Sequence, residues 1–148
     1  MRVRDAMTTD HRTLAPDAIL HDAVALLHAE ASDLMVAHAD GCLVGVLSEG
    51  DLIRALLPDR AEVVAAGGSV EDAFDAFVRK GEELRTRPIA PYVIRDPLTL
   101  SPDDHVGVAA VIFVERQIRR LPVVDHDRLV GTLSRGDTCR AMLGGASP

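Results

Sequence analysis

The stretch Leu43-Val44-Gly45-Val46-Leu47-Ser48-Glu49-Gly50-Asp51 is repeated 86 residues further on as Leu129-Val130-Gly131-Thr132-Leu133-Ser134-Arg135-Gly136-Asp137. The same displacement pairs Thr13-Leu14 with Thr99-Leu100, and no gap is needed anywhere between Asp10 and Leu57. A duplication of this length predicts two structural units, each burying a face against the other. Two copies are too few for a solenoid, so we expect a closed, pseudo-symmetric pair.

Each copy has the hydrophobic pattern of a β-α-β-β-α unit. In the first copy a short extended piece ends at Pro16, and apolar residues at helical spacing predict a helix from Ile19 to Ala31. Strands are expected at 34–37 and 43–47, joined by a turn with hairpin chemistry, before a short helix that begins near Ser48. The second copy repeats this order, with strands at 121–124 and 129–133. The predicted fold class is α/β, with the two units packed sheet to sheet.

The chain divides into four parts: a first repeat at 1–57, a linker at 58–88, a second repeat at 89–143 and a flexible tail at 144–148. The linker is not rich in Gly and Ser, and Ser69-Val70-Glu71-Asp72 has the pattern of a helix capping box. The helix that follows places Val70, Phe74, Phe77 and Val78 on one side. We therefore expect an ordered, helical linker.

Composition limits the possible partners. The 148 residues include 47% hydrophobic residues and carry a net charge of −7. Nucleic acids and anionic membranes select cationic surfaces, so neither is expected as a partner. No stretch is apolar enough to span a membrane, and the two cysteines form no CxxC motif, which favours a soluble, reduced, cytoplasmic protein. The charge is uneven, at −5 for the first repeat, −2 for the linker and zero for the remainder.

The repeated Ser-x-Gly-Asp element has two interpretations. Ser48 followed by Asp51 fits a capping box, in which the side chains satisfy free backbone N–H groups at a helix N-terminus. A cap does not require Gly45 or Gly50. In addition, a glycine inside a helix lowers stability by about 0.5–1 kcal/mol relative to alanine. Keeping both glycines in both copies indicates that something approaches the backbone closely. A helix N-terminus attracts phosphate, and a carboxylate one turn inside it is suited to a vicinal diol such as ribose.

These residues resemble the cystathionine β-synthase (CBS) domain, whose signature is a strand ending in Gly, two apolar residues, Ser or Thr, two further residues and Asp. Two such domains in tandem resemble a Bateman module, an adenine-nucleotide-sensing pair. The resemblance extends to Val3–Thr8, Thr99–Asp104 and Arg120–Asp125 and covers nearly the whole chain except the linker. It implies that Asp51 and Asp137 bind ribose hydroxyls and that Ser48 and Ser134 contact phosphate. It also implies an adenine enclosure built from segments around Thr13, Met35, Thr99, Leu121 and Pro122.

Charge distinguishes the two implied sites. Arg119 and Arg135 correspond to Asp33 and Glu49 in the first copy, and Arg120 lies beside Arg119. If each site uses mostly its own copy, the Asp137 site favours phosphate, and the Asp51 site binds weakly, stays empty or takes a ligand without phosphates. Two alternatives stay open: Arg119 or Arg120 serves the neighbouring copy, or these arginines lie on a solvated or dimer-facing surface.

The predicted function is a stand-alone sensor that binds an adenosyl ligand, such as AMP, ADP, ATP, S-adenosylmethionine or NAD, in the cleft between the repeats and modulates an unidentified partner protein. No obligate cofactor is expected, and the resemblance implies a homodimer. The alternative is a structural or protein-interaction module that binds no ligand, with the Ser-x-x-Asp elements acting as caps only. The chain shows no nucleophile–base pair and none of the common metal-ligand spacings, so we expect no catalytic residues, no metal site and no enzymatic activity.

Overall fold

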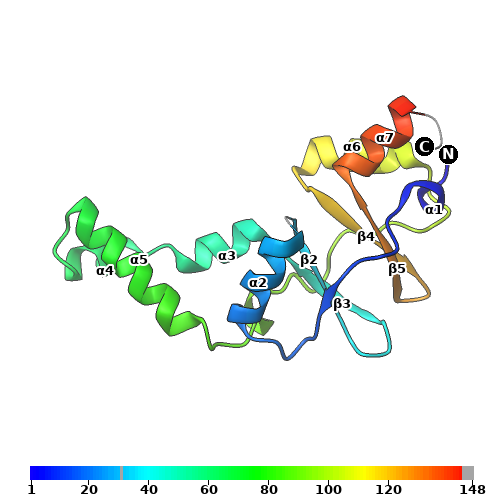
Figure 1. Ribbon diagram of the computed structural model, residues 1–148. Helices are drawn as coiled ribbons and strands as arrows, with labels where there is room; N and C mark the ends of the chain where they lie inside the picture. Colours follow the sequence, from blue (N-terminus) through cyan, green and yellow to red (C-terminus); the bar gives the residue numbers. More distant parts are fainter. Residues whose placement is uncertain (31, 145–148) are drawn as a thin grey trace.

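The computed structural model describes residues 1–30 and 32–144, so Ala31 and residues 145–148 of the expected tail lie outside the described part. The first repeat is a three-stranded sheet in the order β1-β2-β3, with two helices packed against it (Figure 1). Its strands are β1 (Thr13–Leu14), β2 (Leu34–Ala37) and β3 (Leu43–Leu47), and its helices are α2 (Leu20–Glu30) and α3 (Glu49–Leu56). β1 runs parallel to β2, and β2 runs antiparallel to β3. The β-α-β-β-α order predicted for this repeat is confirmed.

The second repeat has the same arrangement with one strand reduced to a single bridge. β4 (Arg120–Asp125) and β5 (Arg128–Ser134) form an antiparallel pair, and α6 (Val106–Arg116) and α7 (Arg135–Gly144) pack on it. Leu100 forms a parallel bridge to Val123, where β1 pairs with β2 in the first repeat. The hairpin turns where expected, since His126 and Asp127 both have positive φ angles.

The segment that enters each repeat packs into the core of the other one. The short helix α1 (Val3–Ala6) buries Val3 among core residues of the second repeat, and its backbone is bonded to Pro102 and Asp104. The 3-10 turn η1 (Ala90–Tyr92) follows Ile89, which is fully buried in the core of the first repeat. Each core is therefore completed by the segment that leads into the other repeat, which couples the two repeats.

Gly45 and Gly131 are where the entering segments touch the other repeat. Val46 and Ile94 exchange backbone hydrogen bonds of 3.0 and 2.8 Å, and Thr8 and Thr132 form the equivalent pair. A Cβ on Gly45 would lie 2.2 Å from the carbonyl oxygen of Ile94, and one on Gly131 would lie 2.8 Å from Met7 Sδ. The sequence predicted that something approaches the backbone closely at these glycines. In the structure, the segments that enter the repeats make this close approach.

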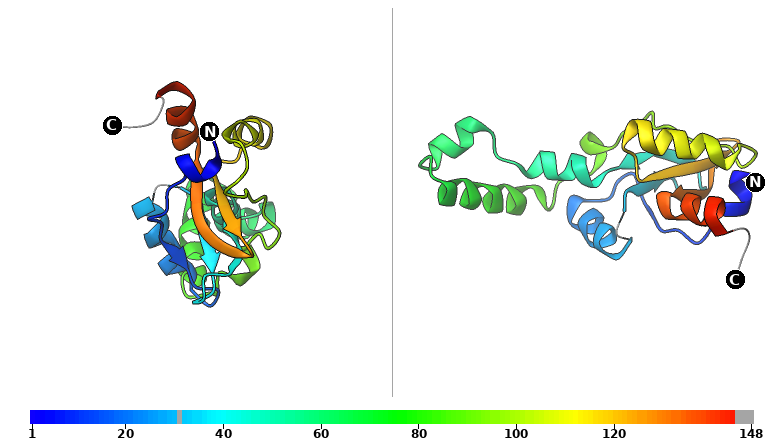
Figure 2. Two further views of the ribbon diagram at one scale, coloured as in Figure 1. Left: turned by 90° about the vertical axis from the view of Figure 1, so that its right-hand side faces the viewer. Right: turned by 90° about the horizontal axis from the view of Figure 1, so that it is seen from above.

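The linker forms a helical arm that extends away from both sheets (Figures 1 and 2). It consists of α4 (Arg60–Ala65) and α5 (Val70–Leu84), joined through Gly67 and Gly68, which both have positive φ angles. Ser69 caps α5 by accepting a hydrogen bond from Asp72 N, so the predicted capping box is present. The base of α5 packs on α3, where Lys80 Nζ donates to the Leu57 carbonyl. The helical linker expected from the sequence is present.

Candidate functional site

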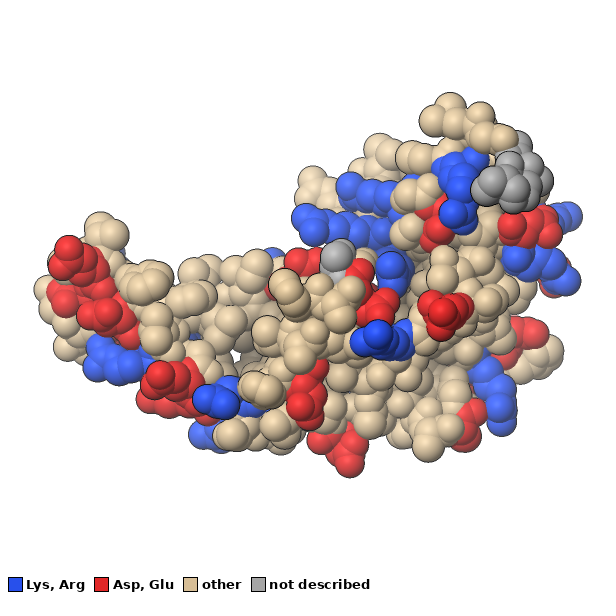
Figure 3. All heavy atoms as spheres, viewed as in Figure 1, with Lys and Arg blue, Asp and Glu red and all other residues tan. Residues whose placement is uncertain are grey.

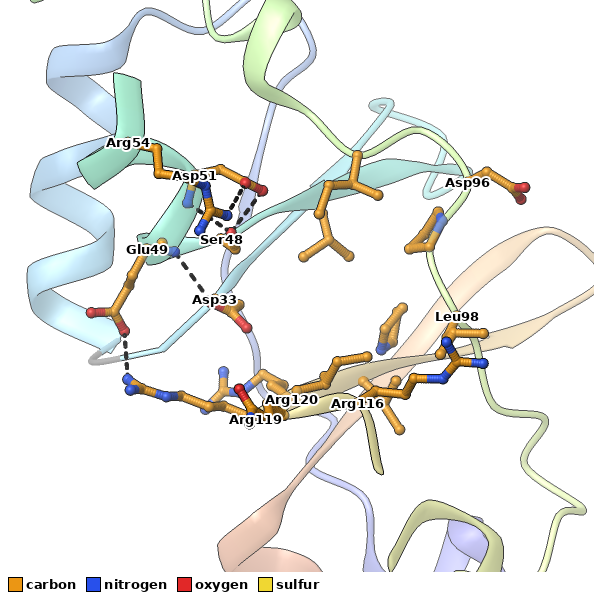
Figure 4. Close-up of a pocket in the computed structure, with 18 of the residues that line it drawn as sticks. Asp33, Ser48, Glu49, Asp51, Arg54, Asp96, Leu98, Arg116, Arg119 and Arg120 are labelled. Carbon is orange, nitrogen blue, oxygen red and sulfur yellow. Dashed lines mark hydrogen bonds and ion pairs between the residues drawn. The ribbon is translucent and has the colours of Figure 1, made fainter. Parts of the chain in front are cut away.

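A cavity of about 650 Å³ lies between the two repeats at the N-terminal end of α3. Figure 4 shows Ser48, Glu49 and Asp51 on one side of it and Arg116, Arg119 and Arg120 on the facing side. The first group belongs to the first repeat and the second group to the second repeat. The volume falls within the range of small-molecule sites, which runs from about 300 to 1,000 Å³.

Ser48 and Asp51 lie at the N-terminal end of α3, on the first side of the cavity, and this end of the helix is called the helix mouth below. Ser48 is in the extended conformation that ends β3, and its hydroxyl accepts a hydrogen bond of 3.1 Å from Asp51 N. The same hydroxyl donates to Asp51 Oδ2 at 2.8 Å, and the Arg54 guanidinium donates to Asp51 Oδ1. Burial raises the pKa of the Asp51 carboxyl, but the hydrogen bonds from Arg54 and Ser48 outweigh it, and the pKa is lowered overall. The group is therefore ionised at neutral pH and remains 26% exposed.

The facing wall is basic because the chain reverses there between α6 and β4. α6 ends at Gln117, whose left-handed conformation turns the backbone and brings Arg119 and Arg120 beside the cavity. Arg119 Nη1 lies 3.7 Å from Glu49 Oε1, which makes an ion pair between the two repeats across the cavity. Arg120 pairs with Glu30 at 3.8 Å, and no partner for its buried Nε is found in the described part of the chain.

Asp33 lies between the helix mouth and these arginines (Figure 4). Its carboxylate accepts a hydrogen bond of 3.3 Å from Glu49 N. Burial raises the pKa of Asp33 and the neighbouring Glu49 carboxylate adds to the rise, while the Glu49 N–H, Arg119 and Arg120 only partly offset it. The cavity thus holds acidic and basic groups side by side.

The remaining walls consist mainly of apolar side chains and backbone atoms. They are formed by Val46, Ile53, Ile94, Pro97, Leu98, Leu121 and Pro122. Gly50, inside the first turn of α3, also lines the cavity, and the nearest heavy atoms to a Cβ built there are those of Arg54 at 3.6 Å. The backbone at Gly50, unlike the backbone at Gly45, is therefore accessible to a group that lies in the cavity.

The second helix mouth, at Ser134 and Asp137, is more fully bonded within the chain. Asp137 Oδ2 accepts from Ser134 N at 3.0 Å and from the Ser134 hydroxyl at 2.7 Å, which completes a capping box. Thr8 and Arg140 also donate to this carboxylate. Its side chain is 13% exposed, half the value for Asp51. The capping interpretation of the Ser-x-x-Asp element therefore describes Asp137 more completely than Asp51.

The structure brings together only some of the predicted site residues. Ser48, Asp51, Arg119, Arg120, Leu121 and Pro122 line one cavity, and Ser134 and Asp137 form the second mouth. Thr13 is exposed and pairs with the buried Met35 inside the first sheet, and Thr99 is exposed beside Leu98. Arg135 points toward α6, where it donates to the carbonyls of Phe113 and Ile118. For these residues a role at a site stays a prediction.

Arg119 and Arg120 line the Asp51 cavity from the opposite repeat, which agrees with the alternative that these arginines serve the neighbouring copy. Asp33 also lines the cavity, together with Arg116, Ile94 and Asp96, three residues that the sequence pattern did not point to. The signal that could have found them is the tandem arrangement itself, since a cleft between two related units takes residues from both. This places the most basic wall opposite the most acidic repeat.

Among the described residues, no group of three or more His, Cys, Asp or Glu side chains is arranged to hold a metal ion. In that same part of the chain, every helix is too short or too polar to cross a lipid bilayer. Neither finding adds a group to the cavity at Asp51.

Two pseudo-symmetric β-α-β-β-α units that share a cleft define the chain as a duplicated α/β module. The family model of the CBS domain matches the chain twice, at residues 3–58 and 89–144. The chain therefore belongs to the CBS-domain family and contains a tandem pair of these domains, as the resemblance implied.

Relatives of this chain include CBS domain-containing proteins. The CBS domain-containing protein YhcV of Bacillus subtilis is 27% identical over 135 residues, covering 91% of this chain and 81% of that protein. The structure of the CBS-pair protein CBSX2 from Arabidopsis thaliana matches with a TM-score of 0.76 at 29% identity, covering 96% of this chain and 94% of that one. A structure of CBSX2 in complex with AMP matches with a TM-score of 0.72 at 27% identity, covering 96% of each chain.

The homoserine O-acetyltransferase of Methanohalophilus mahii is 30% identical over 147 residues, which cover 97% of this chain but 25% of that protein. The match is thus confined to a small part of that enzyme, and the similarity does not extend an acetyltransferase activity to this chain.

Proposed function

We propose that the cavity at Asp51 binds an adenosine nucleotide, AMP above all, and that the chain is a non-enzymatic regulatory module. The observation that carries this proposal is the pairing, in one cavity, of an ionised, partly exposed carboxylate at a helix mouth with three arginines from the opposite repeat. The AMP complex of CBSX2, a CBS pair of the same fold, supports the choice of ligand.

The ribose end of the ligand is assigned to Asp51. A carboxylate accepts hydrogen bonds from both hydroxyls of a vicinal diol, and the lowered pKa keeps Asp51 in the accepting form. Its oxygens are bonded to the Ser48 hydroxyl and to Arg54, which is largely exposed. Because each carboxylate oxygen has more than one acceptor site, a diol can be added without removing Ser48.

The phosphate end is assigned to Arg119 and the first turn of α3. The helix N-terminus offers backbone N–H groups and a favourable dipole, and Gly50 leaves its backbone open. Arg119 reaches the same end of the cavity, where it is paired with Glu49. The apolar wall of Ile94, Leu98 and Pro122 is left for the adenine.

The Arg119–Glu49 ion pair connects ligand binding to the arrangement of the repeats. A phosphate that bonds Arg119 competes with Glu49, so the ligand replaces a contact between the repeats with contacts of its own. A ligand shifts a conformational equilibrium only through different affinities for the two states, and this exchange supplies such a difference. The regulated partner would respond to that change.

The Asp137 mouth is proposed as the weaker site. Its carboxylate already accepts hydrogen bonds from Ser134, Thr8 and Arg140, so a diol must compete with these donors. This order is the reverse of the one expected from the charges of single copies. The chain is also proposed to be a homodimer, since exposed apolar side chains such as Val114 and Leu143 lie on the outer helices of the second repeat.

Isothermal titration with AMP, ADP, ATP, adenosine, S-adenosylmethionine and NAD tests the proposal. Asp51→Asn is expected to weaken AMP binding by about 10- to 100-fold, because hydrogen bonds to charged groups contribute about 1.5–3 kcal/mol. Asp137→Asn is the matched control and should leave the tighter site intact. A 2′,3′-dideoxy AMP should bind the unmodified chain as weakly as AMP binds the Asp51→Asn variant.

Two results would contradict the proposal. If the dideoxy compound binds as tightly as AMP, Asp51 does not hold the diol. If thermal shift and titration detect no binding of any compound in the panel, the alternative of a ligand-free interaction module is favoured, with Ser48 and Asp51 acting as a helix cap only.

A further inference from the structure

Equivalent grooves lie between the two helices of each repeat, and in the first repeat α5 covers part of the groove. That groove is lined by the apolar side chains of α2 and α3 together with Gly81 and Leu84 of α5. Leu84 packs against the core of the first repeat, and a Cβ on Gly81 would lie 3.7 Å from Leu56. The base of α5, which places Gly81 and Leu84 against the groove, is therefore an example of a helix that fits a groove of this shape.

The equivalent groove of the second repeat, between α6 and α7, has no such helix over it in the described part of the chain. The repeat displacement of 86 residues relates Val24 and Leu56 of the first groove to Ala110 and Met142 of the second. The second groove has a volume of about 610 Å³ and leaves Val114 81% exposed. It is lined by Ala110, Phe113, Val114, Gln117, Arg119, Arg135, Thr138, Cys139 and Met142, a set with two arginines and no acid.

The outer half of α5 carries an apolar stripe with an acidic border. Val70, Phe74 and Val78 follow one another at intervals of four residues and are 87%, 65% and 43% exposed. Glu71, Asp75 and Glu82 are exposed along one side of this stripe, and no residue described in α4 or α5 is fully buried. A helix of 15 residues is marginal in water without tertiary packing, so this stripe calls for a partner surface.

The stripe and the second groove match in both chemistry and charge. Acidic side chains border the apolar stripe, and Arg119 and Arg135 line the apolar groove. Figure 3 shows Asp and Glu side chains toward the tip of the arm, with basic side chains nearer its base, and Arg side chains over α6 and α7. The arm and these helices lie at opposite ends of the molecule, so α5 cannot reach the groove of its own chain (Figures 1 and 2).

We propose that the Val70–Phe74–Val78 stripe of α5 docks into the α6–α7 groove of a second copy of this chain. A two-fold axis lets each arm occupy the groove of the other copy, which closes the assembly as an antiparallel dimer. This inference rests on the homodimer proposed above and specifies its arrangement. Arg119 lines both the groove and the Asp51 cavity, but Phe74 lies outside that cavity, so a substitution at Phe74 tests docking without removing a group from the nucleotide site.

Cross-linking at Cys139 tests the arrangement, since this exposed cysteine lines the groove. In a Cys42→Ser background, Phe74→Cys treated with a short bis-maleimide should give a covalent dimer. Peptide mapping should then identify a link between position 74 of one copy and Cys139 of the other. Glu83→Cys is the matched control, because position 83 lies on the opposite side of α5 and should not react with Cys139. Adding Cys139→Ser should abolish the link.

Light scattering over a dilution series separates the possible failures. Phe74→Asp should raise the dimer dissociation constant about tenfold or more, as for a central apolar contact, and leave AMP titration unchanged. A cross-linked product that joins position 74 of both copies would show that the arms pair with each other, and the docking inference would be wrong while the dimer stands. A wild-type chain that stays monomeric at every concentration would overturn the homodimer and the docking together, without affecting the nucleotide proposal.

Discussion

Gly45→Ala is expected to be among the most destabilising single-methyl additions in this chain. The new Cβ would lie 2.2 Å from the Ile94 carbonyl oxygen and 2.7 Å from a methyl carbon of Val93. Ordinary van der Waals contact begins at about 3.4 Å, so the segment at Ile94 must move by about 1 Å. The Gly45 backbone itself is outside the left-handed region, so the clash alone decides the effect.

The magnitude follows from the contacts that this movement breaks. Val46 and Ile94 exchange two backbone hydrogen bonds, which contribute about 0.5–1.5 kcal/mol each. Overpacking strain adds about 1–3 kcal/mol. The free energy of unfolding should therefore fall by about 2–5 kcal/mol, a large part of the roughly 5–15 kcal/mol typical of a domain. Because Ile94 also lines the Asp51 cavity, AMP binding should weaken in the same variant.

Urea unfolding followed by circular dichroism measures this change, with Gly50→Ala as the matched control. Gly50 lies in α3 and has no atom within 3.6 Å of the added Cβ, so alanine there should stabilise the chain by about 0.5–1 kcal/mol through helix propensity. The change in the free energy of unfolding for Gly131→Ala should lie between those of the other two variants, because the nearest neighbour of the added Cβ, at 2.8 Å, is the flexible Met7 side chain. If Gly45→Ala and Gly50→Ala have equal urea midpoints, Gly45 is not needed for the packing of the segment at Ile94.

Three further predictions concern the site and the arm. Arg119→Ala should remove most of the preference for AMP over adenosine in titrations, and an unchanged preference would remove Arg119 from the phosphate site. Asp33→Asn should raise stability at neutral pH, because the raised pKa of Asp33 means that its ionisation disfavours the folded state. This gain in urea midpoint should shrink as the pH falls through the folded pKa and vanish below the ordinary value of 3.8, and a pH-independent gain would contradict it. Ser69→Ala should lower arm stability by about 1 kcal/mol through the lost cap, seen as faster amide exchange in α5 only; exchange that is unchanged there would show that the cap is not needed.

The local elements were predictable because short-range chemistry specifies them. The strands at 34–37 and 43–47 match the apolar runs, and the arm helix begins where Ser69 and Asp72 form a capping box. The destination of α1 was not predictable in this way, because Val3 is apolar in any environment and only the folded chain shows that it completes the core of the second repeat. Which helix N-terminus Arg119 and Arg120 face was left open for the same reason, since their position depends on the opposite repeat.

The pseudo-two-fold relation explains why the charges of the two copies differ. Near such an axis a residue faces its own equivalent, so two identical repeats would place like charges opposite each other. Burial raises the pKa of Asp33, and its equivalent Arg119 lies close enough to offset part of that rise; Arg119 also pairs with Glu49, whose equivalent is Arg135. Arginine at both 33 and 119, or acid at both, would repel across the shared cleft. Opposite charges at positions 33 and 119 are therefore favoured by the interface, and the Arg119→Asp and Asp33→Arg single variants should each lose stability that the double variant regains in urea unfolding.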